Sequence, residues 1–159
     1  MKPAISTAIL MASALILGLG PGIYEHLFRI PKMLSSPAAM AFDFSHSSGQ
    51  AQIFWIPLHL LILFSLSFSL YLNWRNPGRK AFVLWALILY LYVDLISIWF
   101  TRELLALAQL TDGPEFHSRA SLWLILSWHR PLLLLVCQIL LFKAITKPAL
   151  KSVAYESVH

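Results

Sequence analysis

Four long apolar runs constrain this chain more than any other feature of its sequence. They cover roughly residues 4–26, 53–73, 80–100 and 121–142. The length of each run is close to that of a helix that crosses the hydrocarbon core of a bilayer, which needs about 20 residues. Hydrophobic residues make up 58% of the chain and charged residues only 12%, an excess that one small soluble core cannot bury. The sequence therefore predicts an all-α integral membrane protein, with residues 1–159 forming a single antiparallel bundle of four transmembrane helices.

The first run also has the start of a secretory signal peptide, because Lys2 precedes it. No convincing small-x-small cleavage site follows, and the run is longer than the apolar region of a typical signal peptide. We therefore expect it to be retained as a membrane helix.

The basic residues predict how the bundle is oriented. Seven basic residues lie in three segments: before the first run, in the "NWRNPGRK" turn and after the last run. They are Lys2, Arg75, Arg79, Lys80, Lys143, Lys147 and Lys151, and Glu156 is the only acid in these segments. Cytoplasmic segments carry such an excess of lysine and arginine, so both termini are predicted to be cytoplasmic and the two longer loops to lie outside. The expected location is the lipid bilayer of a bacterial inner membrane. The net charge of +5 fits these topology anchors, and no nucleic-acid partner is predicted.

The connections between the runs differ in character. Asn76, Pro77 and Gly78 predict a tight turn between the second and third runs. The Ser- and Pro-containing segment 29–52 is expected to be an irregular or re-entrant cap, whereas "TRELLALAQL" should continue the third helix until "TDGP" stops it. The single cysteine, Cys137, excludes an internal disulfide and a CxxC redox pair.

Ionisable side chains gather in the outer half of the predicted bundle. They include Glu25, His26, His59, Asp94, Glu103, His129 and Arg130. His59 and His129 lie about 9 and 12 Å below the outer ends of their runs, at about 1.5 Å per residue. Because ionisable groups are costly in hydrocarbon, they normally face the bundle interior and find partners there. Pro21, Pro57 and Pro131 should interrupt three of the helices in the same region, which is tolerated where a cavity receives the broken backbone. The pattern predicts an outward-opening polar pocket.

Each of these residues also has a structural interpretation that remains open. His59 and His129 could hold helices together by hydrogen bonds, and Asp94 could pair with Arg102 or Arg130. Arg29 is expected to lie at the membrane interface with its charge in water.

Histidines and carboxylates are suitable ligands for iron or copper, so His26, His59 and His129 are candidate metal ligands. The paired Glu-x-x-His motif of di-iron bundles and the H-E-x-x-H motif are both absent from the sequence. A haem between His59 and His129 is geometrically allowed, and so is a site with no cofactor.

Several segments together resemble a known family: "GIYEHLFRIP", "FWIPLHLLIL", "LNWRNPGRK", "WFTREL" and "SRASLWLILSWHRP". The chain is similar, from about Gly22 to Leu133, to small four-helix membrane proteins of unknown function whose named branch is the anthrone oxygenase-like proteins. The positions that match the family pattern are Glu25, His26, Trp55, Pro57, His59, Glu103, Arg119, Trp123 and Arg130.

The resemblance implies an oxidase or oxygenase that acts on a hydrophobic aromatic or quinone-like molecule. In this hypothesis Glu25 or His59 removes a proton, and Arg130 stabilises the resulting oxyanion. His26 and His129 assist or bind a metal, Glu103 is a further catalytic candidate, and Trp55, Asp94 and Trp123 line the pocket. One alternative is a protein that binds or transports a small molecule without chemistry. The other is an accessory subunit in which the polar cluster serves only packing. The expected partners are the lipid bilayer and a hydrophobic small molecule, and a homo-oligomer is left open.

Overall fold

The chain folds almost entirely into helices. The computed structural model describes residues 3–147, and for residues 3–9, 12, 13, 16 and 47–52 it describes the backbone alone. The elements in order are α1 (Pro3–Tyr24), the π-helix η1 (Glu25–Arg29), α2 (Ile30–Met33), α3 (Pro37–Leu72), α4 (Pro77–Leu107), α5 (Pro114–Ser127) and α6 (His129–Thr146). No strand occurs within this described range.

Local sequence explains where the helices begin. Pro37, Pro77 and Pro114 each occupy the first helical position, where the missing N–H costs nothing and the fixed φ suits a helix. Ser36 caps α3, since its hydroxyl accepts a hydrogen bond from the Ala39 N–H at 3.1 Å. The predicted tight turn is confirmed at residues 73–76, and the predicted extension of the third helix is confirmed because α4 continues to Leu107.

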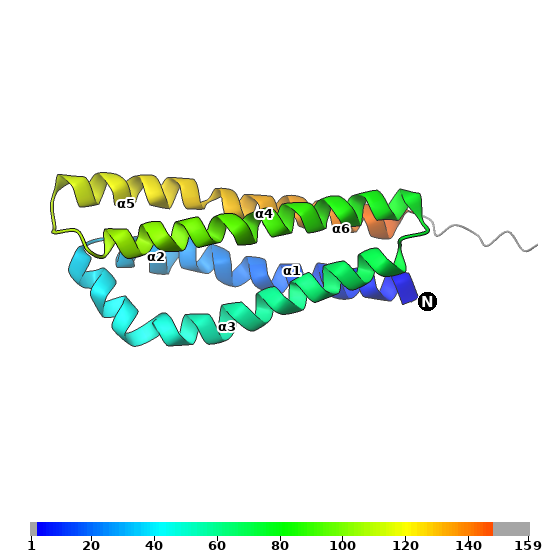
Figure 1. Cartoon of the computed structure of the whole chain (residues 1–159), viewed down its shortest axis with the longest axis horizontal. Coiled ribbons are helices and arrows are strands. Elements are labelled where there is room, and N and C mark those ends of the chain that lie inside the picture. Colours follow the sequence, from blue (N-terminus) through cyan, green and yellow to red (C-terminus); the bar gives the residue numbers. More distant parts are fainter. Residues whose placement is uncertain (1–2, 148–159) are drawn as a thin grey trace, which may run out of the picture.

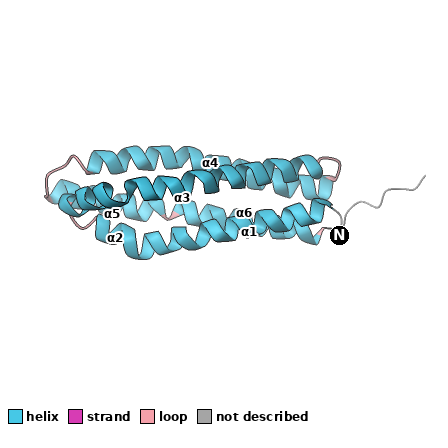
Figure 2. Cartoon of the chain, turned by 90° about the horizontal axis from the view of Figure 1, so that it is seen from below, coloured by secondary structure: helices cyan, strands magenta, loops and turns pink. Residues whose placement is uncertain are grey.

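The helices lie side by side along one axis (Figure 1). α1 contacts α3 and α6, and α4 contacts the same two helices; Figure 2 shows the same arrangement from below. The start of α1, the α3–α4 turn and the end of α6 lie at one end of the molecule, which we call the hairpin end. The α2–α3 and α4–α5 connections lie at the opposite end, the loop end. At the hairpin end the buried Arg79 joins two helices by donating hydrogen bonds of 2.9 and 2.6 Å to the Lys147 carbonyl.

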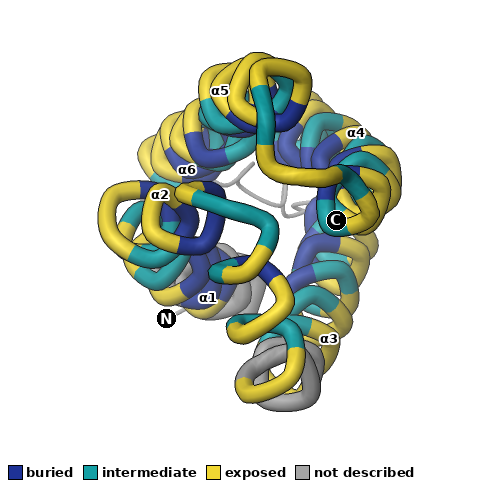
Figure 3. The backbone as a smooth tube through the Cα atoms, turned by 90° about the vertical axis from the view of Figure 1, so that its left-hand side faces the viewer, coloured by how far each residue is buried: buried dark blue, intermediate teal, exposed yellow. Residues whose placement is uncertain are grey.

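Three helical segments are long and apolar enough to cross a membrane: Ile53–Leu72, Pro77–Leu107 and Pro114–Thr146. They match the predicted runs 53–73, 80–100 and 121–142. Large apolar side chains point away from the helix contacts on these segments, among them Phe64, Leu95 and Ile125, and Figure 3 shows exposed positions along their outer faces. A surface of this kind suits lipid rather than water. The first predicted run, 4–26, coincides with α1 and the start of η1, and its crossing of the membrane stays a prediction.

Two expectations about the backbone were wrong. Segment 29–52 is helical except at residues 34–36, because Pro37 starts a capped helix there instead of breaking one. Pro21 and Pro57 do not interrupt their helices, since α1 continues through Pro21 to Tyr24 and α3 continues through Pro57 to Leu72. A proline in a helix removes one hydrogen bond and does not always end the helix. The interruption near Pro131 is confirmed, since α5 ends at Ser127 and α6 begins at His129.

The buried side chains form two clusters along the bundle. The cluster toward the hairpin end includes Leu66, Val83 and Leu141. The cluster toward the loop end includes Met40 and Phe116. A cavity of about 460 Å³ lies at the level where the two clusters meet, since its lining takes residues from both the α1–α3 contact and the loop-end cluster.

Candidate functional site

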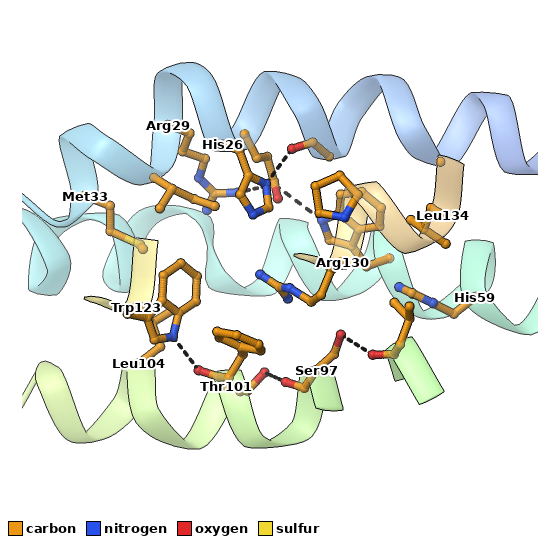
Figure 4. Close-up of a pocket in the computed structure, with 18 of the residues that line it drawn as sticks. His26, Arg29, Met33, His59, Ser97, Thr101, Leu104, Trp123, Arg130 and Leu134 are labelled. Atoms are coloured by element: carbon orange, nitrogen blue, oxygen red, sulfur yellow. Dashed lines mark hydrogen bonds and ion pairs between the residues drawn. The ribbon is translucent and has the colours of Figure 1, made fainter. Parts of the chain in front are cut away.

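The cavity is lined by residues from α1 and η1, from α3, from α4, and from α5 and α6. Six of the residues predicted for the site line it: Glu25, His26, Trp55, His59, Trp123 and Arg130. Much of the remaining wall is apolar, with Ile30, Val93 and Leu134 among the lining residues. A large, mostly apolar hollow with a few convergent polar groups is the usual form of a small-molecule site. Figure 4 shows how these side chains face one another.

The π-helix η1 supplies three of the polar wall residues: Glu25, His26 and Arg29. The Ile30 N–H bonds to the Glu25 carbonyl, five residues back, which widens this turn. Pro31 follows and has no N–H to offer the Leu27 carbonyl, so one α-helical hydrogen bond is missing where the π-helix passes into α2. π-helical turns within helices are frequent at functional sites. The first predicted run ends at residue 26, within this turn, and the sequence pattern did not predict a π-helix here.

Arg29 lies at the centre of an ion-pair network on one side of the cavity. Its Nη1 donates to Glu25 Oε1 at 2.9 Å, and its Nε and Nη2 donate to the two carboxylate oxygens of Asp43 at 3.2 and 2.9 Å. Trp55 Nε1 donates to the same Glu25 oxygen at 3.4 Å. Hydrogen bonding by Asp43 raises the pKa of Arg29 above its ordinary value, so this guanidinium is always charged. The position of Arg29 at the membrane interface stays a prediction, and the structure adds its two carboxylate partners and its place in the cavity lining.

Asp43 also lines the cavity, and the sequence analysis did not identify it. It lies in the segment expected to be irregular, which gave no face on which to place it. A helix that begins at Ser36–Pro37 places Asp43 between two aromatic residues, Phe42 and Phe44. A single acid in such a position needs a basic partner, and this signal could have identified it.

His59 and Asp94 form a pair across α3 and α4. His59 Nδ1 lies 2.7 Å from Asp94 Oδ1, and the same nitrogen lies 2.7 Å from the Tyr90 hydroxyl oxygen. One nitrogen holds at most one proton, so it donates to Asp94 when protonated and accepts from Tyr90 when bare. His59 lines the cavity whereas Asp94 does not. The expected pairing of Asp94 with Arg102 or Arg130 was wrong, because the carboxylate is paired with His59.

Arg130 lines the cavity and forms no ion pair with a carboxylate among the residues that the structure describes. Its guanidinium carbon lies 4.7 Å from the centre of the Phe100 ring and 5.6 Å from that of Trp123. Its Nε is buried and has no hydrogen-bond partner within the described range. Trp123 Nε1 in turn donates to the Phe100 carbonyl at 2.9 Å, which fixes the aromatic wall on which the cation lies.

His26 presents one nitrogen with no partner. The Gly22 carbonyl accepts a hydrogen bond from His26 Nδ1 at 2.7 Å, which leaves Nε2 as an acceptor in the neutral ring. Nε2 is buried and without a hydrogen-bond partner among residues 3–147. The ring itself is held by contact with Trp128, with 5.1 Å between ring centres.

Three residues predicted for the site lie outside the cavity lining: Asp94, described above, and Glu103 and His129. Glu103 accepts a hydrogen bond from Arg119 at 3.0 Å, in a partly exposed pair. His129 packs against Phe100, with 5.3 Å between ring centres, and its Nδ1 lies 2.5 Å from the Leu126 carbonyl oxygen. The described part of the chain contains no group of three or more His, Cys, Asp or Glu side chains placed to hold a metal ion, so the candidate ligands His26, His59 and His129 are not brought together.

Comparison of the chain with protein-family models, with curated proteins and with solved structures gave no significant match. The fold and the cavity define an all-helical protein with three membrane-length apolar helices and a cavity lined by residues of these helices and of α1 and η1. The resemblance to anthrone oxygenase-like proteins stays a prediction.

Proposed function

We propose that the chain is a four-pass membrane protein whose cavity binds a lipophilic aromatic molecule and removes a proton from it. The topology of the proposal has both termini on the cytoplasmic side, so that the loop end faces outward. Arg75, Arg79, Lys80, Lys143 and Lys147 lie at the hairpin end, as expected for the cytoplasmic side. The cavity then lies in the outer half of the bilayer, where a lipophilic ligand can reach it from the lipid.

The observation that carries this proposal is the pairing of His59 with Asp94 at the edge of a mostly apolar cavity. A carboxylate that accepts the Nδ1 proton of a histidine fixes the tautomer in which Nε2 is the base, and it stabilises the imidazolium that forms. His59 Nε2 has no hydrogen-bond partner within the described range. His59 is therefore the proposed base and Asp94 its positioning residue.

The proposed reaction follows the chemistry that the family resemblance implies. An activated methylene group between aromatic rings loses a proton to His59, and the electron pair moves onto the neighbouring carbonyl oxygen. Molecular oxygen then oxidises the enolate: one CH₂ group and one O₂ give one C=O group and one water. Arg130, which faces the cavity, would stabilise the developing oxyanion, because fixed charges in a water-poor site act strongly.

Glu25 is less well placed to act as the base. Its Oε1 already accepts hydrogen bonds from Arg29 and Trp55, so this oxygen is engaged by the cavity wall and is not free to meet a proton of the ligand. Its proposed role is to hold Arg29 and Trp55 in the cavity wall.

The test is oxygen uptake by the purified protein in lipid nanodiscs with anthrone as substrate. His59→Gln should remove the catalysed uptake while the protein remains folded. His117→Gln is the matched control, because His117 is exposed and pairs only with the exposed Asp112 at 3.1 Å; it should keep full activity. Equal uptake by wild type and His59→Gln would remove the base from the proposal. Tight binding of anthrone without any uptake by wild type would instead favour a binding or transport protein.

A further inference from the structure

The Nδ1 atom of His59 has two partners that require opposite protonation states of this nitrogen. Asp94 Oδ1 and the Tyr90 hydroxyl oxygen each lie 2.7 Å from it. The ionised carboxylate of Asp94 can only accept a hydrogen bond, so it requires a proton on Nδ1. The Tyr90 hydroxyl can donate its own proton only to a bare Nδ1. No neutral tautomer of the ring therefore satisfies both partners.

The Tyr90 hydroxyl depends on His59 for its hydrogen bond. The Tyr90 side chain is 1% exposed and belongs to the apolar cluster toward the hairpin end, with Leu66 and Val83. Among the described residues, His59 Nδ1 is the one hydrogen-bond partner of the Tyr90 hydroxyl. A buried hydroxyl without an acceptor for its proton is costly. The burial of Tyr90 therefore favours a bare Nδ1 on His59.

Asp94 is the stronger partner of His59 but the less deeply buried one. A hydrogen bond to a carboxylate is stronger than one between neutral groups, which favours a protonated Nδ1. The Asp94 side chain is 24% exposed, however, so its carboxylate is not sealed from other donors as the Tyr90 hydroxyl is. Tyr90 and Asp94 lie one helical turn apart on α4 and reach His59 from the same side. The two residues therefore compete for one nitrogen.

We infer that Tyr90 is a positioning residue that opposes Asp94 and keeps part of the neutral His59 in the tautomer with its proton on Nε2. This inference rests on the proposed function and deepens it, because the tautomer decides what His59 presents to the cavity that it lines. With Nδ1 bonded to Asp94, Nε2 is bare and acts as the base. With Nδ1 accepting from Tyr90, Nε2–H is a hydrogen-bond donor and removes no proton. Tyr90 itself does not line the cavity, so it acts through His59.

NMR of the histidine ring nitrogens tests the inference, because protonated and bare ring nitrogens give well-separated signals. Protein labelled with ¹⁵N-histidine is measured in lipid nanodiscs without substrate, at a pH above which the spectrum no longer changes. The signals that are absent from His59→Gln belong to His59. Wild type should show both tautomers. Tyr90→Phe should shift their ratio by about fivefold or more toward Nδ1–H, the size of one net hydrogen bond, and Asp94→Asn should shift it toward Nε2–H.

Tyr92→Phe is the matched control on the same helix. The Tyr92 ring lies against His129, with 6.4 Å between ring centres, and no contact of Tyr92 with His59 is found among the described residues. This variant should keep the wild-type ratio of His59 tautomers.

Two results would overturn the inference: a wild-type ring that carries its proton on Nδ1 alone, and a ratio that Tyr90→Phe leaves unchanged. If Tyr90→Phe does not fold, 3-fluorotyrosine in place of Tyr90 decides. Its hydroxyl is a stronger donor and should shift the ratio toward Nε2–H, and an unchanged ratio would again overturn the inference.

Activity separates this inference from the proposed function. If anthrone is oxidised, kcat of Tyr90→Phe should rise by the same factor as the fraction of Nδ1–H, whereas a purely structural role of Tyr90 would lower kcat. The NMR measurement needs no turnover. A ratio that depends on Tyr90 in a protein without oxidation would reject the proposed reaction alone, and oxidation by a ring with only Nδ1–H would reject the role of Tyr90 alone.

Discussion

His59 Nδ1 lies 2.7 Å from Asp94 Oδ1, and this contact joins the two helices of the central hairpin at the cavity wall. A histidine held in this way has one nitrogen committed to the protein and one left for a ligand. The geometry gives two otherwise separate residues, 35 positions apart in the chain, a joint chemical role, and the first prediction tests that role.

Asp94→Asn should lower kcat for anthrone oxidation by about 10² to 10⁴ and leave KM within about twofold. The amide can still hydrogen-bond to His59, but it cannot stabilise an imidazolium and it permits the wrong tautomer. Steady-state kinetics in nanodiscs separate the two constants. A purely structural role for Asp94 would change KM and thermal stability together with kcat, and that result would remove Asp94 as the positioning residue.

The ion pair of Arg29 with Asp43 should stabilise the loop end. Its two hydrogen bonds tie η1 to the first turns of α3, and the pair is partly exposed, with side-chain exposures of 30% and 19%. We therefore expect a coupling free energy of only about 1 kcal/mol. A double-mutant cycle with Arg29→Met, Asp43→Asn and the double variant, followed by thermal unfolding in detergent, measures it. Additive effects of the two substitutions would mean that the contact contributes nothing to stability.

Arg130→Met should stabilise the protein in the absence of ligand. The contacts with Phe100 and Trp123 contribute about 0.5–2 kcal/mol, whereas an uncompensated charge in the membrane costs at least about 2.5 kcal/mol. The melting temperature of Arg130→Met should therefore be higher than that of wild type. Arg119→Met is the control. Arg119 is paired with Glu103, so its replacement should not raise the melting temperature. A lower melting temperature for Arg130→Met would show that the arginine is a structural element.

The four-pass topology predicts which positions an impermeant thiol reagent can reach. Cys137 is buried, so Cys137→Ser provides a background without cysteines. A cysteine in place of Asp112, in the exposed α4–α5 connection, should react from the outside of intact cells. A cysteine in place of Arg75, in the α3–α4 turn, should react only after the membrane is opened. Labelling in the reverse order would contradict the proposed orientation.

The sequence was sufficient to locate the helices that could cross the membrane, because an apolar run of about 20 residues is a strong and local signal. It also identified six of the residues that line the cavity, since ionisable groups at one depth in a bundle tend to meet. It could not identify the π-helical turn at Glu25–Arg29, because that turn depends on which carbonyl Ile30 bonds to.

The pairings were harder to predict than the positions. Asp94 had an arginine near in sequence and another at a similar predicted depth, and only the rotation of α4 against α3 decides that its partner is His59. Asp43 was missed because its segment has the composition of a loop, although Ser36 and Pro37 start a helix there. Such contacts depend on tertiary packing, which one sequence does not specify locally.

Anthrone-dependent oxygen uptake, measured together with the quinone formed, tests the central claim most directly. Purified wild type in nanodiscs should consume one O₂ for each anthraquinone that appears, at a rate well above that of empty nanodiscs, and His59→Gln should fall to the background rate. The contradicting result is oxygen uptake by wild type that is no faster than uptake by empty nanodiscs, although the protein is folded and anthrone is bound. This result would show that the cavity does not carry out proton removal and oxidation.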